Sequence, residues 1–242
     1  MKIIITNNYE EISNEANKVI RTIITENPNA ILGLATGSSP IGLYKNMIKD
    51  NENGLTSYKN IKTVNLDEYV GIDETNNQSY IYFMKDNLFN HIDIDLKNVN
   101  LPNGKPADLQ EECERYTALL NENVQDVQVL GIGANGHIGF NEPNTAFDST
   151  THIVTLQDKT RADNARFFES LDKVPTLAIT MGIKNIMNAK KILIVANGLN
   201  KADAVYKMVK GEISETCPAS VLQNHPDVVL IIDKDAASKL DK

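Results

Sequence analysis

Short apolar runs, each followed by a polar turn and then by a stretch with helical periodicity, constrain the fold of this chain more than any other feature. The run Ile192-Leu193-Ile194-Val195-Ala196 contains no polar side chain. Such a strand needs cover on both faces, which is typical of parallel sheets. We expect strands over Lys2–Thr6, Ala30–Ala35, Ile61–Leu66, Val127–Ile132, Ile153–Leu156, Thr176–Thr180, Lys191–Ala196 and Val228–Ile232.

Helices are expected between these strands. Ile12, Ala16, Val19, Ile20 and Ile23 form one amphipathic stripe. Further helices are predicted over Ile41–Lys49, Gln78–Asn90, Ala107–Glu122, Thr160–Glu169 and Asn200–Val209. Strands that alternate with helices imply right-handed crossovers. The prediction is a single α/β domain over residues 1–242, with an open, doubly wound, mostly parallel sheet and helices on both faces, as in Rossmann-like folds.

Composition excludes several classes of protein. The chain has 242 residues and a formal net charge of −8, which disfavours a nucleic-acid binder. No apolar run approaches the ~18 residues that a membrane span requires. Cys113 and Cys217 are the only cysteines and form no CxxC pair, so we expect neither a disulfide framework nor a metal site, and a cytoplasmic location.

Ligands of open α/β sheets bind beyond the carboxyl ends of the strands, so the residues after each strand matter most. Thr36, Gly37, Ser38, Ser39 and Pro40 follow the second predicted strand and precede a helix. Free amides at a helix start can bind an anion, and the serines offer hydroxyl groups and a helix cap. The alternative is a plain capped turn. The segment matches neither nucleotide-binding glycine motif.

Two carboxylates, Asp67 and Glu68, follow the strand Ile61–Leu66. Burying a carboxylate without a hydrogen-bonding or charged partner is unfavourable. Two carboxylates at the end of a strand therefore need a structural or functional explanation. Asp67 is either a helix-capping residue or a base at the crevice. These residues alone favour neither interpretation.

The segment after Val127–Ile132 is the richest in chemistry. His137 stands in a glycine-rich loop, and Glu142 follows five residues later. A carboxylate that holds one ring nitrogen makes histidine an effective acid–base group. A single histidine is nevertheless more often structural. No serine or cysteine stands in a nucleophile elbow.

Cations follow two further strands. Arg161 and Arg166, two of the four arginines, come after Ile153–Leu156, and Lys201 comes after Lys191–Ala196 at a helix start. A solvated helix face is the ordinary place for two arginines. A lysine at a helix start is unfavourable unless an anion is nearby. Arg166, Lys201 and the 36–39 segment could therefore converge on one phosphate.

Four motifs together carry a resemblance that extends from Ile31 to about Asp233. They are LATGSSP (34–40), NLDEYVG (65–71), GIGANGHIGFNEP (131–143) and TRADNARFF (160–168). With them the chain resembles the glucosamine-6-phosphate deaminase family. Sugar-phosphate lactonases share the fold and a looser glycine–histidine loop, but lack the DEYVG and FNEP strings.

The resemblance implies that glucosamine 6-phosphate and water give fructose 6-phosphate and ammonia, without cofactor or metal. It implies that Asp67 moves a proton between C2 and C1, and that His137, oriented by Glu142 and Asn135, opens the sugar ring. It further implies a set of phosphate-binding residues. They are Thr36, Gly37, Ser38, Ser39, Arg166 and Lys201.

Some positions depart from the family pattern. Many members carry Asp where Asn135 stands, and an amide cannot offset imidazolium charge. Activated members carry basic residues where His152 and Val154 stand, and they continue beyond the position of Lys242. We therefore expect no activation by N-acetylglucosamine 6-phosphate, and a monomer or small homo-oligomer.

Two alternatives to the deaminase interpretation remain open from the sequence. The enzymatic alternative is a hydrolase of the 6-phosphogluconolactonase type, and the other is a sugar-phosphate sensor without turnover. In the main interpretation the partner is a small-molecule substrate, with no nucleic acid or membrane.

Residues from about 144 to 172 are expected to close over the crevice as a lid.

Overall fold

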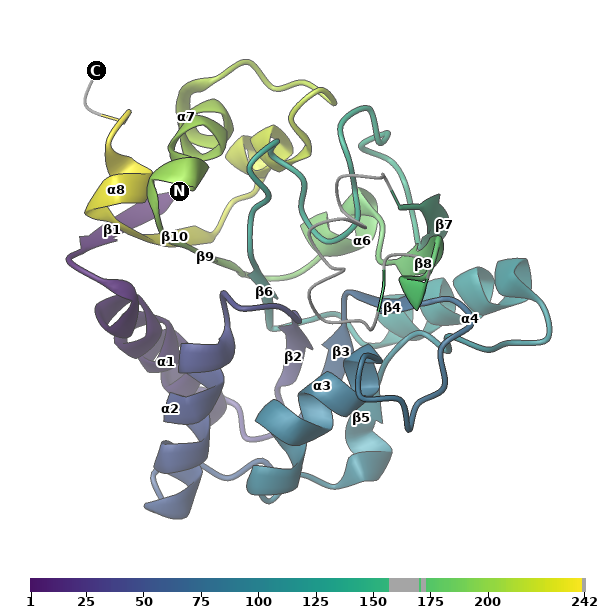
Figure 1. The fold of residues 1–242 in the computed structure, drawn as a ribbon. Helices are drawn as coiled ribbons and strands as arrows, with labels where there is room; N and C mark the ends of the chain where they lie inside the picture. Colours follow the sequence, from purple (N-terminus) through teal and green to yellow (C-terminus); the bar gives the residue numbers. More distant parts are fainter. Residues whose placement is uncertain (157–169, 171–172, 241–242) are drawn as a thin grey trace.

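Seven parallel strands form the central sheet of the computed structural model, which describes residues 1–156, 170 and 173–240 (Figure 1). In spatial order they are β1 (Lys2–Thr6), β10 (Val228–Asp233), β9 (Ile192–Ala196), β6 (Val127–Leu130), β2 (Ile31–Leu34), β3 (Lys62–Asn65) and β5 (Val99–Asn100). The chain progresses from β2 to β3 on one side and resumes with β6 on the other. The order therefore reverses between β2 and β6, which confirms a doubly wound sheet.

Helices cover both faces of this sheet. The first face packs against α1 (Tyr9–Glu26), α2 (Ile41–Glu52) and α3 (Tyr80–Asn87). The second packs against α4 (Leu109–Glu122), α6 (Ile183–Met187), α7 (Ala202–Lys210) and α8 (Lys234–Ala237).

The strand β9 shows why the apolar runs are continuous. Leu193 and Val195 lie in the first core, whereas Ile192, Ile194 and Ala196 lie in the second. Successive side chains of a strand point to opposite faces, so a strand between two helical layers must be apolar throughout. The predicted fold class is confirmed.

A second, three-stranded sheet lies beside the first. It contains β4 (Asp67–Tyr69), β8 (Leu177–Thr180) and β7 (His152–Thr155), paired antiparallel in the order β4-β8-β7. Two of the predicted runs, Ile153–Leu156 and Thr176–Thr180, are thus strands outside the parallel sheet. The partner β4 is rich in carboxylates, so no hydrophobic pattern marked it as a strand.

Polar caps move the helix bounds inward from the predicted ranges. The predicted helix Gln78–Asn90 begins only at Tyr80, because the side chain of Ser79 accepts a hydrogen bond from Tyr82 N. The predicted helix Ala107–Glu122 begins at Leu109, because Asp108 accepts from Gln110 N and Glu111 N. The predicted helix Thr160–Glu169 lies outside the described residues.

Short 3₁₀ turns connect several of these elements. They span Phe89–His91, Leu96–Asn98, Leu199–Lys201 and Pro218–Asn224. In the part of the chain that the structure describes, no helix has the length and apolar character needed to cross a membrane.

Candidate active site

Three loops meet where the strand order reverses. Ser39, after β2, lies opposite Gly131, after β6: a Cβ at Gly131 would be 3.5 Å from Ser39 Oγ. A Cβ at Gly139 would be 3.7 Å from Asp67 Oδ2. The segments predicted to carry chemistry after β2, β3 and β6 are therefore neighbours, at the edge where open α/β sheets bind ligands.

The 36–39 loop is held by the hydroxyl group of one tyrosine, Tyr9. Tyr9 Oη, from α1, lies 2.9 Å from Ser38 O and 3.0 Å from Ser39 O, and accepts a hydrogen bond from Gly42 N. Gly37 has a φ of +93°, which favours glycine. The predicted serine cap is wrong: the N-cap of α2 is Pro40, and no side chain caps it. The serine hydroxyls are thus left for other partners.

The His137 loop folds around its glycines. The imidazole ring lies against the backbone of Gly133, where a Cβ would come within 2.3 Å of Cε1. His137 Nδ1 is 3.5 Å from Glu142 Oε1. Asn135 Nδ2 donates to Glu142 Oε2 at 2.7 Å, and Asn135 Oδ1 accepts from His137 N. The predicted trio of His137, Glu142 and Asn135 is therefore contiguous, and Glu142 lies at its centre.

The side chain of Asp67 is buried at the start of β4, opposite Thr180 of β8. No described residue donates a hydrogen bond to its carboxylate. Burial, together with the charge of Glu68, raises the pKa of Asp67 to about 8. Burial raises the pKa of Glu68 to about 6, and three backbone amides oppose this change. Asp67 is thus a carboxylate with high proton affinity in strand β4, not a helix cap.

The two predicted phosphate-binding cations differ in what the structure shows. Lys201 lies at the N-cap of α7, after β9, on the same edge of the sheet and one strand from β6. Arg166 and Arg161 lie outside the described residues. Among residues 1–156, 170 and 173–240, no three His, Cys, Asp or Glu side chains gather as metal ligands.

Several residues that shape the site were not predicted. Thr180 Oγ1 accepts a hydrogen bond from Phe140 N. Cys217 packs behind the His137 loop, where a Cβ at Gly136 would lie 2.5 Å from its Sγ, and Ala219 N donates to Gly136 O. Tyr9 belongs to the same group. Their positions depend on contacts distant in sequence, and no local pattern indicates them.

Comparison with known proteins agrees with this architecture. The family model of glucosamine-6-phosphate isomerases and 6-phosphogluconolactonases matches residues 6–230. The chain therefore belongs to this family of sugar-phosphate enzymes.

Individual relatives point to one branch of the family. A glucosamine-6-phosphate deaminase of Clostridium novyi is 56% identical over 99% of this chain and 100% of its own. One from Thermoanaerobacter pseudethanolicus is 51% identical over 98% of this chain and 94% of its own.

Solved structures extend the comparison. A monomeric glucosamine-6-phosphate deaminase superimposes with a TM-score of 0.96 at 48% identity, covering 98% of this chain and 99% of its own. The 6-phosphogluconolactonase of Trypanosoma brucei has a TM-score of 0.80 at 19% identity, covering 99% and 98%. This second likeness concerns the fold alone.

Proposed function

We propose that this chain converts glucosamine 6-phosphate and water to fructose 6-phosphate and ammonia. The observation that carries the proposal is a buried carboxylate of raised pKa, Asp67, beside a loop in which Glu142 Oε1 lies 3.5 Å from His137 Nδ1. The deaminase relatives, which match nearly the whole chain, support the same reaction.

His137 acts first, on the closed sugar ring. It takes the proton of the anomeric hydroxyl and delivers a proton to the ring oxygen, so that the C1–oxygen ring bond breaks and a carbonyl forms at C1. Glu142 orients the imidazole and stabilises its charged form. Asn135 positions Glu142 through its amide, without adding charge of its own.

Asp67 then moves a proton between two adjacent carbons. It removes the C2 proton while the C1 oxygen takes up a proton from water, which yields an enolamine across C1 and C2. It then returns a proton to C1, and the nitrogen lone pair forms a C=N bond at C2. The resulting imine at C2 adds water, the C2–nitrogen bond breaks and ammonia leaves. One carboxylate can serve both carbons because they lie side by side on one face. The electrons stay within the sugar, so the proposed steps need no redox cofactor or metal.

The phosphate serves as a remote anchor whose binding energy holds C1 and C2 against Asp67. The 36–39 loop contributes Thr36, Gly37, Ser38 and Ser39, and the cations are Lys201 and Arg166. A few local donors must do this work, because the net charge of −8 repels the phosphate.

The proposal has a lid, a location and an assembly state. Residues from about 144 to 172 are expected to close over bound substrate, and residues 157–169, 171 and 172 of this range lie outside the described residues. Within this range β7 is described and paired with β8. Equal hydrogen exchange in this segment with and without fructose 6-phosphate would exclude closure.

The proposed location is the cytoplasm, because two free, buried cysteines suit a reducing compartment. The chain is expected to be a monomer or small homo-oligomer. Light-scattering chromatography would give a mass near 26.8 kDa for a monomer and a multiple of it for an oligomer.

A coupled assay tests the function directly. The purified chain receives glucosamine 6-phosphate in one arm and 6-phosphogluconolactone in the other, and ammonia and acid release are scored. Ammonia from the first arm is the expected result. Acid release from the lactone without ammonia would instead indicate a hydrolase, and tight substrate binding without turnover would indicate a sensor.

Asp67→Asn tests the role of the carboxylate. The substitution keeps the shape of the side chain, so KM should stay within severalfold. We expect kcat to fall by about 10²–10⁴-fold, because the base is lost. Asp86→Asn is the matched control, since Asp86 is an exposed aspartate of α3. Ammonia release near the wild-type rate by Asp67→Asn would reject this role.

His137→Gln tests ring opening. The variant should react more slowly with the cyclic sugar than with an open-chain analogue, relative to wild type, because only the cyclic form needs His137. Equal losses on both substrates would remove His137 from this step.

A further inference from the structure

Glu68 takes no part in the steps above, although it follows Asp67 directly and is only 4% exposed. Its carboxylate accepts hydrogen bonds from three backbone amides. Oε1 accepts from Tyr69 N and Tyr80 N, each at 2.9 Å, and Oε2 accepts from Tyr80 N at 3.0 Å and Ile81 N at 3.1 Å. Tyr80 and Ile81 open α3, so the carboxylate also faces the positive end of that helix.

The turn at residues 103–105 covers this contact from outside. Gly71 N donates to Gly104 O at 2.7 Å. A Cβ on Gly104 would lie 2.4 Å from Tyr69 O and 3.2 Å from Glu68 Cγ, so the turn packs directly against the side chain of Glu68.

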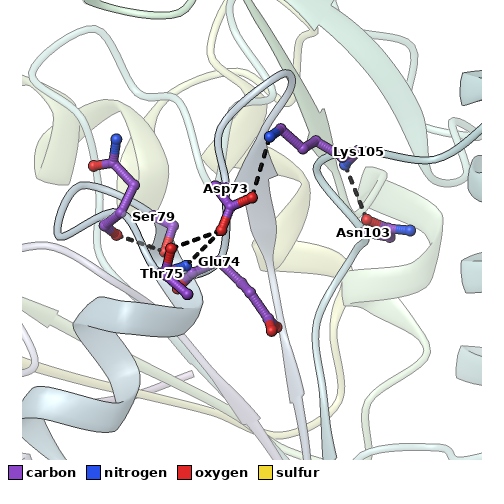
Figure 2. Close-up of polar contacts among 7 residues, drawn as sticks. Asp73, Glu74, Thr75, Ser79, Asn103 and Lys105 are labelled. Atoms are coloured by element: carbon purple, nitrogen blue, oxygen red, sulfur yellow. Dashed lines mark hydrogen bonds and ion pairs between the residues drawn. The ribbon is translucent and has the colours of Figure 1, made fainter.

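Polar contacts also fix the segment that connects β4 to α3 (Figure 2). Lys105 Nζ lies 3.2 Å from Asp73 Oδ2, and Asp73 Oδ1 accepts from the amide and the hydroxyl of Thr75. Ser79 Oγ donates to Glu74 O or to Asn76 O. These contacts link the connection from β4 to α3 internally and to the turn at residues 103–105.

The other groups near the two carboxylates carry no compensating charge. No described lysine or arginine forms an ion pair with Glu68. The buried phenols of Tyr80 and Tyr116 also lie near Asp67. Burial raises the pKa of each phenol, so both stay neutral around pH 7. Lys105 is occupied with Asp73 at the surface. Glu68 is thus the charged group that acts on Asp67 within this part of the structure.

We propose that Glu68 is a positioning residue that ties β4 to the amino end of α3 and places a second carboxylate next to Asp67 along β4. The inference rests on the proposed deamination and extends it. Repulsion between the two carboxylates disfavours ionised Asp67 and so makes it a stronger base. A stronger base suits proton removal from a weakly acidic C–H bond.

Glu68→Gln tests the charge, since glutamine matches glutamate in size and its Oε1 can still accept from the α3 amides. The pH dependence of kcat/KM for ammonia release is measured. We expect the acid limb to move to lower pH by about one unit, because the repulsion is lost. We also expect kcat to fall by about tenfold, with KM changed less than about threefold.

Asp50→Asn is the matched control, because Asp50 is a second buried carboxylate, held by Asn17 and Arg21 and outside the three loops of the site. Its acid limb should coincide with that of wild type. An acid limb of Glu68→Gln that coincides with that of wild type would overturn the proposal.

Glu68→Asp tests the tie, and also serves if Glu68→Gln does not fold. The shorter side chain keeps its charge but cannot reach both Tyr80 N and Ile81 N. The acid limb of the kcat/KM profile should stay at its wild-type pH. We expect kcat to fall and KM to stay close to that of wild type. A wild-type kcat in Glu68→Asp would overturn the tie. If the wild-type chain itself releases no ammonia, the proposed function fails instead, and the two failures remain distinct.

Discussion

The Asp67 carboxylate links activity and stability within one residue. Its pKa is raised by burial and by Glu68 to about 8, from an ordinary value of 3.8. Between these pH values the folded chain binds more protons at this position than the unfolded chain does. Stability therefore falls as the pH rises through this interval, whereas below pH 3.8 both states are protonated and the contribution disappears.

Asp67→Asn should consequently stabilise the fold in a pH-dependent manner. We expect its melting temperature to exceed that of wild type by several degrees at pH 8, and the difference to shrink toward zero near pH 4. Thermal unfolding followed by circular dichroism across this range measures the effect. A difference that grows as the pH is lowered would contradict the assigned direction of the pKa.

Gly136 supports the His137 loop through backbone geometry. Its φ is +88°, and a Cβ there would lie 2.5 Å from Cys217 Sγ. Gly136→Ala should cost about 1–3 kcal/mol in the free energy of unfolding and reduce kcat. Gly54→Ala is the control, because Gly54 has a φ of +70° with nothing within 4 Å of an added Cβ. Urea titration of both variants separates the cost of backbone strain at a positive φ from the cost of steric overlap with Cys217. Equal losses in the free energy of unfolding would mean that Cys217 moves aside without cost.

At the scale of elements, helix α1 fixes the loop after β2. Tyr9 Oη bridges Ser38 O, Ser39 O and Gly42 N. Tyr9→Phe should raise KM for the sugar phosphate by about three- to tenfold, because a hydrogen bond of this kind contributes about 1 kcal/mol, while kcat stays within twofold. Tyr206→Phe, on the exposed face of α7, is the control. An unchanged KM in Tyr9→Phe would separate this contact from phosphate binding.

At the scale of the whole molecule, the two cores share strands. β6, β9 and β10 each contribute side chains to both, so neither helical layer can separate without exposing the other face of the sheet. We expect one cooperative unfolding transition. Far-ultraviolet circular dichroism and tyrosine fluorescence should give coincident thermal curves. Two resolved transitions would instead indicate that the β4-β8-β7 sheet melts independently.

The sequence by itself determined the main sheet and the segments that bring chemistry to its edge. Continuous apolar runs such as Ile192–Ala196 specify strands buried on both faces, and that requirement is local. The contiguity of His137, Glu142 and Asn135 was also readable, since the three residues share one short loop. The order of the strands in the sheet could be predicted only as doubly wound, because a hydrophobic pattern identifies strands but not which strands are neighbours.

The tertiary structure decided what depends on residues distant in sequence. The antiparallel pairing of β4 with β8 places Asp67 opposite Thr180, and no hydrophobic periodicity in the sequence predicts this pairing. Tyr9 and Cys217 contact loops about 30 and 80 residues away. The raised pKa of Asp67 has the same origin. Burial is a property of the assembled layers, and a carboxylate has its ordinary proton affinity until the surrounding chain removes its water.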